Sequence, residues 1–424
     1  MDNIRERLFT KDYILIMFSS IVFAMMNVFF LTVVPLYIVR IGGLTVHSGL
    51  LLMVFSAAAL VFRPVAGILT DRFGRVKLLI IGALGSAVTC VLFGVVGTIP
   101  LLMLVRGFNG MSFSISSTCS GAAIADVIPK SRLGEGLGYF SLYTTISQAV
   151  GPAIVLFMIA GDTLGEYRTL FFSVAGFCVL SAITNCFITY ERKAKKNAGG
   201  DKAAPVARRR KEKPEYAAPV LQNAGEPLPK TLLGFEYVVF APIVAMVLTQ
   251  IGVSGLTTFV APYARWKGFG DPKLYYTVCA LGIFFSRMVF GKVVDRRGPD
   301  VVIVPSMIAL IIVLILIPTA NSLTMLIVLG FPLGLSQGAI FPSLNSIMFK
   351  RCSAARRGTA SGAYFTAVDL GYAIGAPLLG ALADARDYRY IYWASAVFVL
   401  LSLSFYLLVT SEKRFKARLS RSAQ

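Results

Sequence analysis

Residues 63–75 read RPVAGILTDRFGR, and residues 287–298 read RMVFGKVVDRRG. Each segment contains an arginine, a glycine, an Asp-Arg pair and a closing glycine, and the equivalent positions are 224 residues apart. The same offset relates four further positions: Arg132, Gly134, Gly138 and Gly151 correspond to Arg356, Gly358, Gly362 and Gly375. Because each copy lies between two very apolar segments, the sequence predicts a membrane protein that is built from two similar halves.

The apolar residues form long blocks. Hydrophobic residues make up 56% of the chain and charged residues only 15%, with a mean hydropathy of +0.73, whereas soluble proteins carry about 25% charged residues. A helix that spans a bilayer needs roughly 20 apolar residues. We therefore expect an all-α membrane protein with twelve transmembrane helices in two pseudo-symmetric six-helix bundles. The spans are predicted near residues 12–39, 47–70, 78–97, 99–124, 136–160, 169–190, 234–262, 274–293, 300–320, 323–348, 358–383 and 390–410.

The net charge of +20 has a distribution that argues against a nucleic-acid partner. Most of the 41 lysine and arginine residues lie at the two termini and in loops on one side of the predicted spans. This positive-inside bias predicts a multi-pass protein of the cell (inner or plasma) membrane with both termini in the cytoplasm. The predicted domains are an N-terminal six-helix bundle (1–190), a basic cytoplasmic linker (191–230), and a C-terminal six-helix bundle with a cytoplasmic tail (231–424).

The residues that support enzyme chemistry are scarce. His47 is the only histidine, and the six cysteines show no metal-binding spacing. No Ser-His catalytic set can therefore be assembled, and the sequence predicts no catalytic residue, no metal site and no cofactor. We do not expect an enzyme.

Three motifs carry a resemblance to a known family. Residues 67–77 (GILTDRFGRVK) resemble the signature of the loop between helices 2 and 3 of the major facilitator superfamily, and residues 106–110 (RGFNG) resemble its fourth-helix signature. Residues 138–152 resemble the fifth-helix antiporter motif in part, with Ser147 in place of a glycine and Val155 and Leu156 in place of a glycine pair. Nearly the whole chain resembles a transporter of this superfamily, from the drug/metabolite:proton antiporter branch.

The resemblance implies a gating role for the repeated turn. In that family the aspartate, here Asp71, faces the start of the eleventh helix, where partial positive charge favours a carboxylate. Arg75 would pair with Asp126, Asp295 would make a weaker contact in the second half, and Gly151 with Pro152 would allow a hinge in the fifth helix. The simpler interpretation is that these charges only anchor a short loop. The predicted gating residues are Gly67, Asp71, Arg72, Arg75, Asp126, Asp295, Gly151 and Pro152.

Polar groups inside the spans predict the transport site. A charge such as Arg106 within a span costs roughly 2.5–3.5 kcal/mol on insertion scales, so it is a functional candidate. Asp369 is the one acid deep within a span, and it could couple transport to a proton together with Arg106, or serve as a permanently hydrogen-bonded carboxylate at a bend. The resembled fold lines its cavity with helices 1, 4, 7 and 10, which implies a substrate site of Asn27, Arg106, Asn109, Gln250 and Gln337. Part of this set could instead join neighbouring helices, at about 0.6 kcal/mol each.

These features together predict a secondary active transporter. Its partners are a small-molecule substrate, protons and the lipid bilayer, and it is expected to act as a monomer. The resemblance implies proton-coupled efflux of a small organic solute by alternating access. The alternative is an importer or facilitator of a sugar or organic acid.

Overall fold

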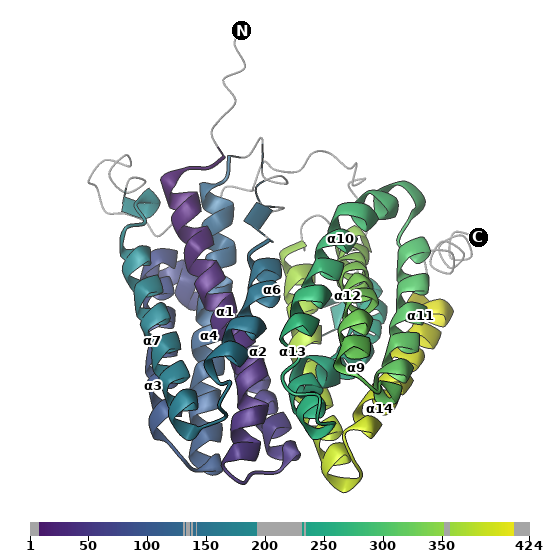
Figure 1. Ribbon diagram of the computed structural model, residues 1–424. Coiled ribbons are helices and arrows are strands. Elements are labelled where there is room, and N and C mark those ends of the chain that lie inside the picture. The colour runs from purple at the N-terminus through teal and green to yellow at the C-terminus, as the bar shows by residue number, and fades with distance from the viewer. Residues whose placement is uncertain are drawn as a thin grey trace, which may run out of the picture. The chain divides into compact units, whose positions relative to one another are not determined.

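The computed structural model describes residues 8–129, 132, 136, 139–140, 142–192, 231–232, 235–351 and 357–410. These residues include twelve helices of 17 residues or more, which confirms the predicted all-α fold (Figure 1). The helices of the first half are α1 (Lys11–Arg40), α2 (Thr45–Phe73), α3 (Arg75–Val95), α4 (Ile99–Val127), α6 (Leu142–Met158) and α7 (Leu164–Cys186). Those of the second half are α9 (Tyr237–Trp266), α10 (Lys273–Arg297), α11 (Asp300–Leu316), α12 (Leu323–Arg351), α13 (Arg357–Ala385) and α14 (Arg389–Phe405).

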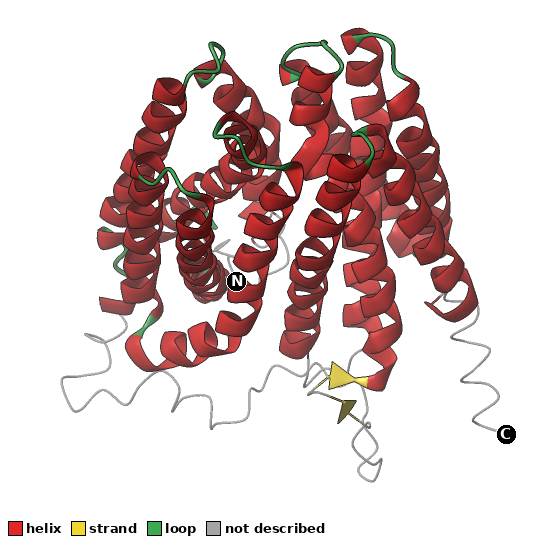
Figure 2. Ribbon diagram, turned by 90° about the horizontal axis from the view of Figure 1, so that it is seen from below, coloured by secondary structure: helices red, strands yellow, loops and turns green. Residues whose placement is uncertain are grey.

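Ten of these helices are long and apolar enough to cross a membrane by length and composition alone. The other two are α4, whose apolar run is broken by Arg106 and several serines, and α6, next to residues that lie outside the described ones. A short 3₁₀ segment, η3 (Ile317–Thr319), extends α11, and a π-helical turn, η5 (Tyr406–Thr410), extends α14. Two two-residue strands, β1 (Thr231–Leu232) and β2 (Phe235–Glu236), pair antiparallel just before α9 and are yellow in Figure 2.

The repeated turn has the same backbone conformation in both copies. Gly74 lies between α2 and α3 with φ 91° and ψ 156°, and Gly298 lies between α10 and α11 with φ 86° and ψ 164°. This region of backbone space is accessible almost only to glycine. The chain therefore requires a glycine at this position in both copies of the repeated turn, where it connects two consecutive helices.

The chain divides into two compact units. Unit 1 comprises residues 1–41 and 54–214, and unit 2 comprises residues 42–53 and 215–424. The first turns of α2 thus belong to unit 2, and the rest of α2 belongs to unit 1. Of the predicted linker 191–230, only Glu191 and Arg192 are among the described residues.

In unit 1, α1 packs against α4, α6 and α7, and α3 packs between α4 and α7 (Figure 1). Aromatic rings join these helices near one end: the Phe30 ring lies 4.9 Å from that of Phe93, and the Phe93 ring lies 5.4 Å from that of Phe171. Such pairs add to the apolar packing energy because edges and faces carry opposite partial charge. These rings therefore join α1, α3 and α7 to one another within unit 1.

In unit 2, α9 packs against α13 and α14, α10 packs against α12, and α11 packs against α12 and α14. Glycines set the closest approaches. A Cβ on Gly334 of α12 would lie 1.9 Å from the Cys279 carbonyl oxygen of α10, and one on Gly375 of α13 would lie 2.4 Å from Ser254 Oγ of α9. Small residues at such positions let transmembrane helices meet backbone to backbone, where dispersion replaces the missing hydrophobic driving force.

Candidate functional site

Arg106 is enclosed within unit 1. It lies on α4 and is 2% exposed. Its guanidinium carbon lies 4.6 Å from the centroid of the Phe30 ring of α1 and 4.2 Å from that of the Phe55 ring of α2. Nη1 donates a hydrogen bond of 2.6 Å to Asn109 Oδ1, one turn further along α4. The Asn109 amide nitrogen in turn donates a 3.0 Å hydrogen bond to Thr89 Oγ1 of α3.

The two rings and Asn109 take the place that an acidic side chain would normally have beside a buried arginine. Among the described residues no carboxylate forms an ion pair with Arg106, and its Nε has no hydrogen-bond partner. A cation over an aromatic face gains about 2 kcal/mol when both are desolvated. Two rings and one charge-assisted hydrogen bond therefore offset the cost of a positive charge at this depth.

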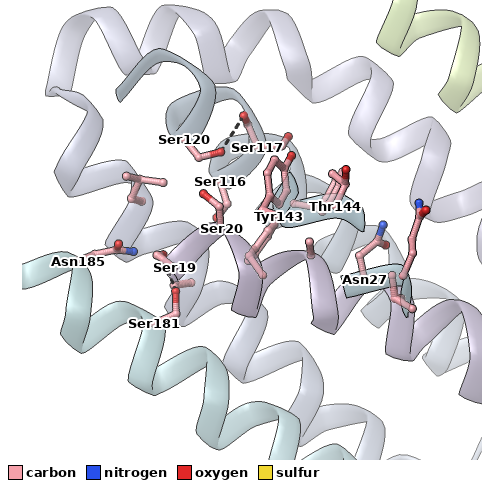
Figure 3. A pocket seen from close by; sticks show the side chains of 17 residues that line it. Ser19, Ser20, Asn27, Ser116, Ser117, Ser120, Tyr143, Thr144, Ser181 and Asn185 are labelled. Carbon is pink, nitrogen blue, oxygen red and sulfur yellow. Dashed lines mark hydrogen bonds between the residues drawn. The ribbon is translucent and has the colours of Figure 1, made fainter. Parts of the chain in front are cut away.

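A cavity of about 110 Å³ lies in the same unit, between α1, α3, α4, α6 and α7 (Figure 3). None of its lining residues is charged. The polar lining consists of Ser19, Ser20, Asn27, Ser116, Ser117, Ser120, Tyr143, Thr144, Gln148, Ser181 and Asn185. An uncharged, hydroxyl- and amide-rich wall can bind a polar group by hydrogen bonds and offers no counter-charge to an ion.

Part of this lining is paired within the protein. The hydroxyl groups of Ser19 and Ser181 lie 2.7 Å apart and join α1 to α7, and Ser120 Oγ donates to the Ser117 carbonyl at 3.2 Å. The rings of Phe23 and Phe113 stack at 5.5 Å and form an apolar part of the wall. Arg106 and Asn109 are not among the lining residues, so the cation and the cavity are separate features of unit 1.

A second polar cluster lies in unit 2, between α9 and α13. Asp369 is 6% exposed and lies near the middle of α13. The hydroxyl group of Tyr372, one turn further along α13, lies near the side chains of Gln250 and Thr257 of α9 and near Asp369. A Cβ on Gly371 would lie 2.5 Å from Gln250 Cβ, so the missing side chain lets α9 approach this cluster.

The repeated turn of unit 1 contains the expected ion pair. Arg75 Nε lies 2.7 Å from Asp126 Oδ2, which joins the start of α3 to the end of α4. Glu191 Oε1 also accepts a 2.6 Å hydrogen bond from the backbone N–H of Arg75 at the α3 N-terminus, where unpaired N–H groups favour a carboxylate. Arg75 thus contacts two acids, Asp126 at the end of α4 through its side chain and Glu191, beyond the end of α7, through its backbone N–H.

The comparison with family models supplies the classification. The model of the Major Facilitator Superfamily matches residues 16–318 and 273–423. The chain belongs to this superfamily. It is accordingly a membrane transporter of small molecules and not an enzyme.

Two similar proteins come from Staphylococcus aureus. The Quinolone resistance protein NorA of strain MRSA252 is 25% identical over 394 residues, which cover 92% of this transporter and 93% of that protein. The Staphylopine export protein of strain Mu50 / ATCC 700699 is 22% identical over 397 residues, which cover 93% and 94% of the two chains.

Solved structures share the fold. The nucleoside transporter NupG has a TM-score of 0.70 at 14% identity and covers 95% of this transporter and 100% of its own chain. A bacterial homolog of the human lysosomal transporter Spinster, in an inward-facing and occupied conformation, has a TM-score of 0.72 at 15% identity, with 93% and 95% covered.

The predicted substrate residues of this transporter fall into separate places. Arg106 and Asn109 form the buried pair, Asn27 lines the cavity, and Gln250 belongs to the α9–α13 cluster. Gln337 is half-buried on α12. The substrate and proton-coupling roles of these residues stay predictions.

The structure describes the side chains of only some of the predicted gating residues. The side chains of Asp71 and Asp295 lie outside the described residues. Apart from its chain neighbours and the backbone of its own helix, no atom among the described residues lies within 4 Å of a Cβ built on Gly67, and Arg72 is exposed. Gly151 does support close packing: its Cβ would lie 3.0 Å from Val28 Cγ1 of α1, and Pro152 beside it is buried. The gating roles remain predictions.

The sequence missed most of the cavity. Ser19, Ser181 and Asn185 were not expected at a site. One signal was available: Ser112, Ser116 and Ser120 recur every four residues on α4, a spacing that places hydroxyl groups on one face of a helix.

Proposed function

We propose that this transporter exports a small organic solute in exchange for protons by alternating access. The observation that carries the direction is the similarity to NorA and to the Staphylopine export protein, which extends over more than nine-tenths of each chain. The names of those proteins describe resistance to a drug and export of a metabolite. In the proposed cycle, the two predicted bundles expose one site to each side of the membrane in turn.

Asp369 is the proposed proton carrier. A buried carboxyl group within a span can hold a proton in one state and lose it in another. The Tyr372 hydroxyl group lies near this carboxyl group, and the Gln250 side chain of the facing helix lies near Tyr372. Arg106 is proposed to contribute a fixed positive charge in unit 1, held by Phe30, Phe55 and Asn109.

The topology and the oligomeric state belong to the same proposal. The loops and termini rich in lysine and arginine are proposed to face the cytoplasm, and the chain is proposed to act as a monomer in the cell membrane. The Arg75–Asp126 pair would then lie at the cytoplasmic end of unit 1 and would support its proposed part in the gate.

The test uses inside-out membrane vesicles and a solute found by comparing cells with and without the protein. An inward-acidic pH gradient should drive accumulation of that solute by the wild-type protein. Asp369→Asn should abolish this accumulation but retain solute exchange at equal pH. Asp387→Asn is the control, because Asp387 lies in the loop between α13 and α14 and outside the helices.

Two outcomes would contradict the proposal. Accumulation by Asp369→Asn at the wild-type rate would remove this residue from proton coupling. Uptake by intact cells that needs no pH gradient would instead support the alternative, an importer or facilitator of a sugar or organic acid.

A further inference from the structure

The cavity in unit 1 contains buried hydrogen-bonding groups that the described residues leave unpaired. Both amide atoms of Asn185, the hydroxyl group of Ser116 and the amide oxygen of Asn27 are buried without a partner. Asn185 is 1% exposed and Ser116 is 4% exposed, and all three side chains line the cavity (Figure 3). Buried polar groups are almost always paired in folded proteins, so such a cluster indicates a place where water or a ligand binds.

The unpaired atoms define the chemistry of the ligand. Whichever way its amide is oriented, Asn185 offers one donor and one acceptor, and the Ser116 hydroxyl group can act as either. A carboxylate only accepts hydrogen bonds and an ammonium group only donates them, so either ion would leave part of this set unpaired. A neutral amide or hydroxyl group has donors and acceptors together.

The electrostatic surroundings favour the same class. No charged side chain lines the cavity, and transfer of an ion from water to a site without a counter-charge is strongly unfavourable. The lining runs from Ser19 to Val28 of α1, a rise of about 13 Å along the helix. A volume of about 110 Å³ has room for roughly three or four water molecules or for a narrow polar group of similar size.

We infer that this cavity binds a neutral amide- or hydroxyl-bearing part of the exported solute and discriminates against ions. The inference rests on the proposed export function and names the class of solute. The stacked rings of Phe23 and Phe113 would contact the carbon side of the bound group, while Asn185 and Ser116 would pair with its polar side.

The test compares acetamide with acetate, which have nearly the same size and shape but differ in charge and in donors. The full-length protein is purified in detergent, and its Tm is measured with each compound up to about 100 mM at constant ionic strength. Ligands that bind only the folded state raise the Tm by an amount that grows with the logarithm of the ligand concentration once this exceeds the Kd. We expect acetamide to raise the Tm and acetate to leave it unchanged.

Variants locate the effect. Asn185→Leu removes two hydrogen-bonding atoms and should weaken acetamide binding roughly tenfold or more. Ser116→Ala removes one hydroxyl group, should weaken binding by a few fold, and keeps the test valid if Asn185→Leu does not fold. Asn345→Leu is the matched control: Asn345 of α12 also has a buried, unpaired amide oxygen but does not line the cavity, so its acetamide response should equal that of the wild type.

Three results would overturn the inference. If acetamide gives no concentration-dependent rise in Tm, the cavity holds water only. An equal response to acetate would refute the discrimination against ions, and a wild-type response in both Asn185→Leu and Ser116→Ala would place the binding site elsewhere. None of these measurements requires transport, so a failure of pH-driven export would contradict the proposed function without changing the result for the cavity.

Discussion

The first turn of α2 is held by a carboxylate, and removal of that carboxylate should loosen the turn. Within unit 2, Asp384 of α13 accepts a 2.8 Å hydrogen bond from the Thr45 N–H at Oδ1 and a 2.6 Å hydrogen bond from the Val46 N–H at Oδ2. The first N–H groups of a helix have no partner within the helix, and partial positive charge gathers there. The hydroxyl groups of Thr45 and Tyr388 lie 3.1 Å apart and add a second contact.

The geometry fixes the expected size of the effect. Asp384→Asn keeps one acceptor oxygen but loses the second oxygen and the negative charge. An exposed capping side chain contributes about 0.5–2 kcal/mol, so we expect a loss of about 1 kcal/mol, or roughly fivefold in the opening equilibrium of the turn. Asp384→Ala removes both acceptors and should cost about 2 kcal/mol, or roughly thirtyfold.

Hydrogen–deuterium exchange of peptides that cover residues 42–53 measures this opening directly. Amide exchange of Thr45 and Val46 should accelerate by the factors given above, because exchange of a protected amide follows local opening. Asp387→Asn is the matched control, since Asp387 lies three residues further along and its carboxylate pairs with Arg389 at 2.7 Å. Unchanged exchange in Asp384→Ala, or an equal acceleration in Asp387→Asn, would refute the capping role.

Three further predictions concern other parts of the chain. Arg106→Lys keeps the charge but loses the planar stacking on two rings, so we expect a lower Tm and at least a roughly tenfold fall in transport, measured at equal protein levels. Gly334→Val would place a side chain 1.9 Å from the Cys279 carbonyl oxygen before relaxation, so little folded protein should be recovered in size-exclusion chromatography. Hydrogen bonds from Arg389 lower the pKa of the Asp387 carboxyl group below its ordinary value. The carboxylate therefore contributes to stability above the unfolded pKa of about 3.9, and this contribution is lost as the pH falls through the folded pKa. The Tm difference between the wild type and Asp387→Asn should therefore stay constant from about pH 5 to about pH 8 and shrink progressively as the pH falls below about 3.9.

The helices could be predicted because their signal is local. A run of apolar residues forms a membrane helix whatever its neighbours are, so the predicted span 323–348 corresponds to α12, which covers Leu323–Arg351. The predicted span 136–160 corresponds to α6 (Leu142–Met158) together with residues 136, 139 and 140, which are helical as well; the residues between them lie outside the described ones. The strands β1 and β2 were not expected, since two-residue strands are too short to show an alternating pattern.

The cavity could not be predicted in the same way, because it depends on how five helices pack. Serine is common in membrane helices, where its hydroxyl group usually bonds a carbonyl one turn earlier, as Ser86 does with Gly82 at 2.9 Å. Sequence does not distinguish that serine from Ser116, whose hydroxyl group is buried without a partner. Asn27 could be predicted because the resembled fold lines its cavity with the first helix, and Asn27 lies within that span.

The surroundings of Arg106 bear on how solute binding and proton binding would be coupled under the proposed function. A cation held by an acid could take part in proton exchange through that acid, but Phe30, Phe55 and Asn109 cannot titrate at physiological pH. The cavity in unit 1 also has no charged lining. The solute group and the proton would therefore bind in different units, with Asp369 in unit 2, and would not compete for one position. Coupling between them would then have to arise from a change of conformation, in which each ligand favours one state. Solute affinity of Asp369→Asn should accordingly lose its pH dependence while Arg106 remains in place, and a pH dependence that persists in this variant would show that another group carries the proton.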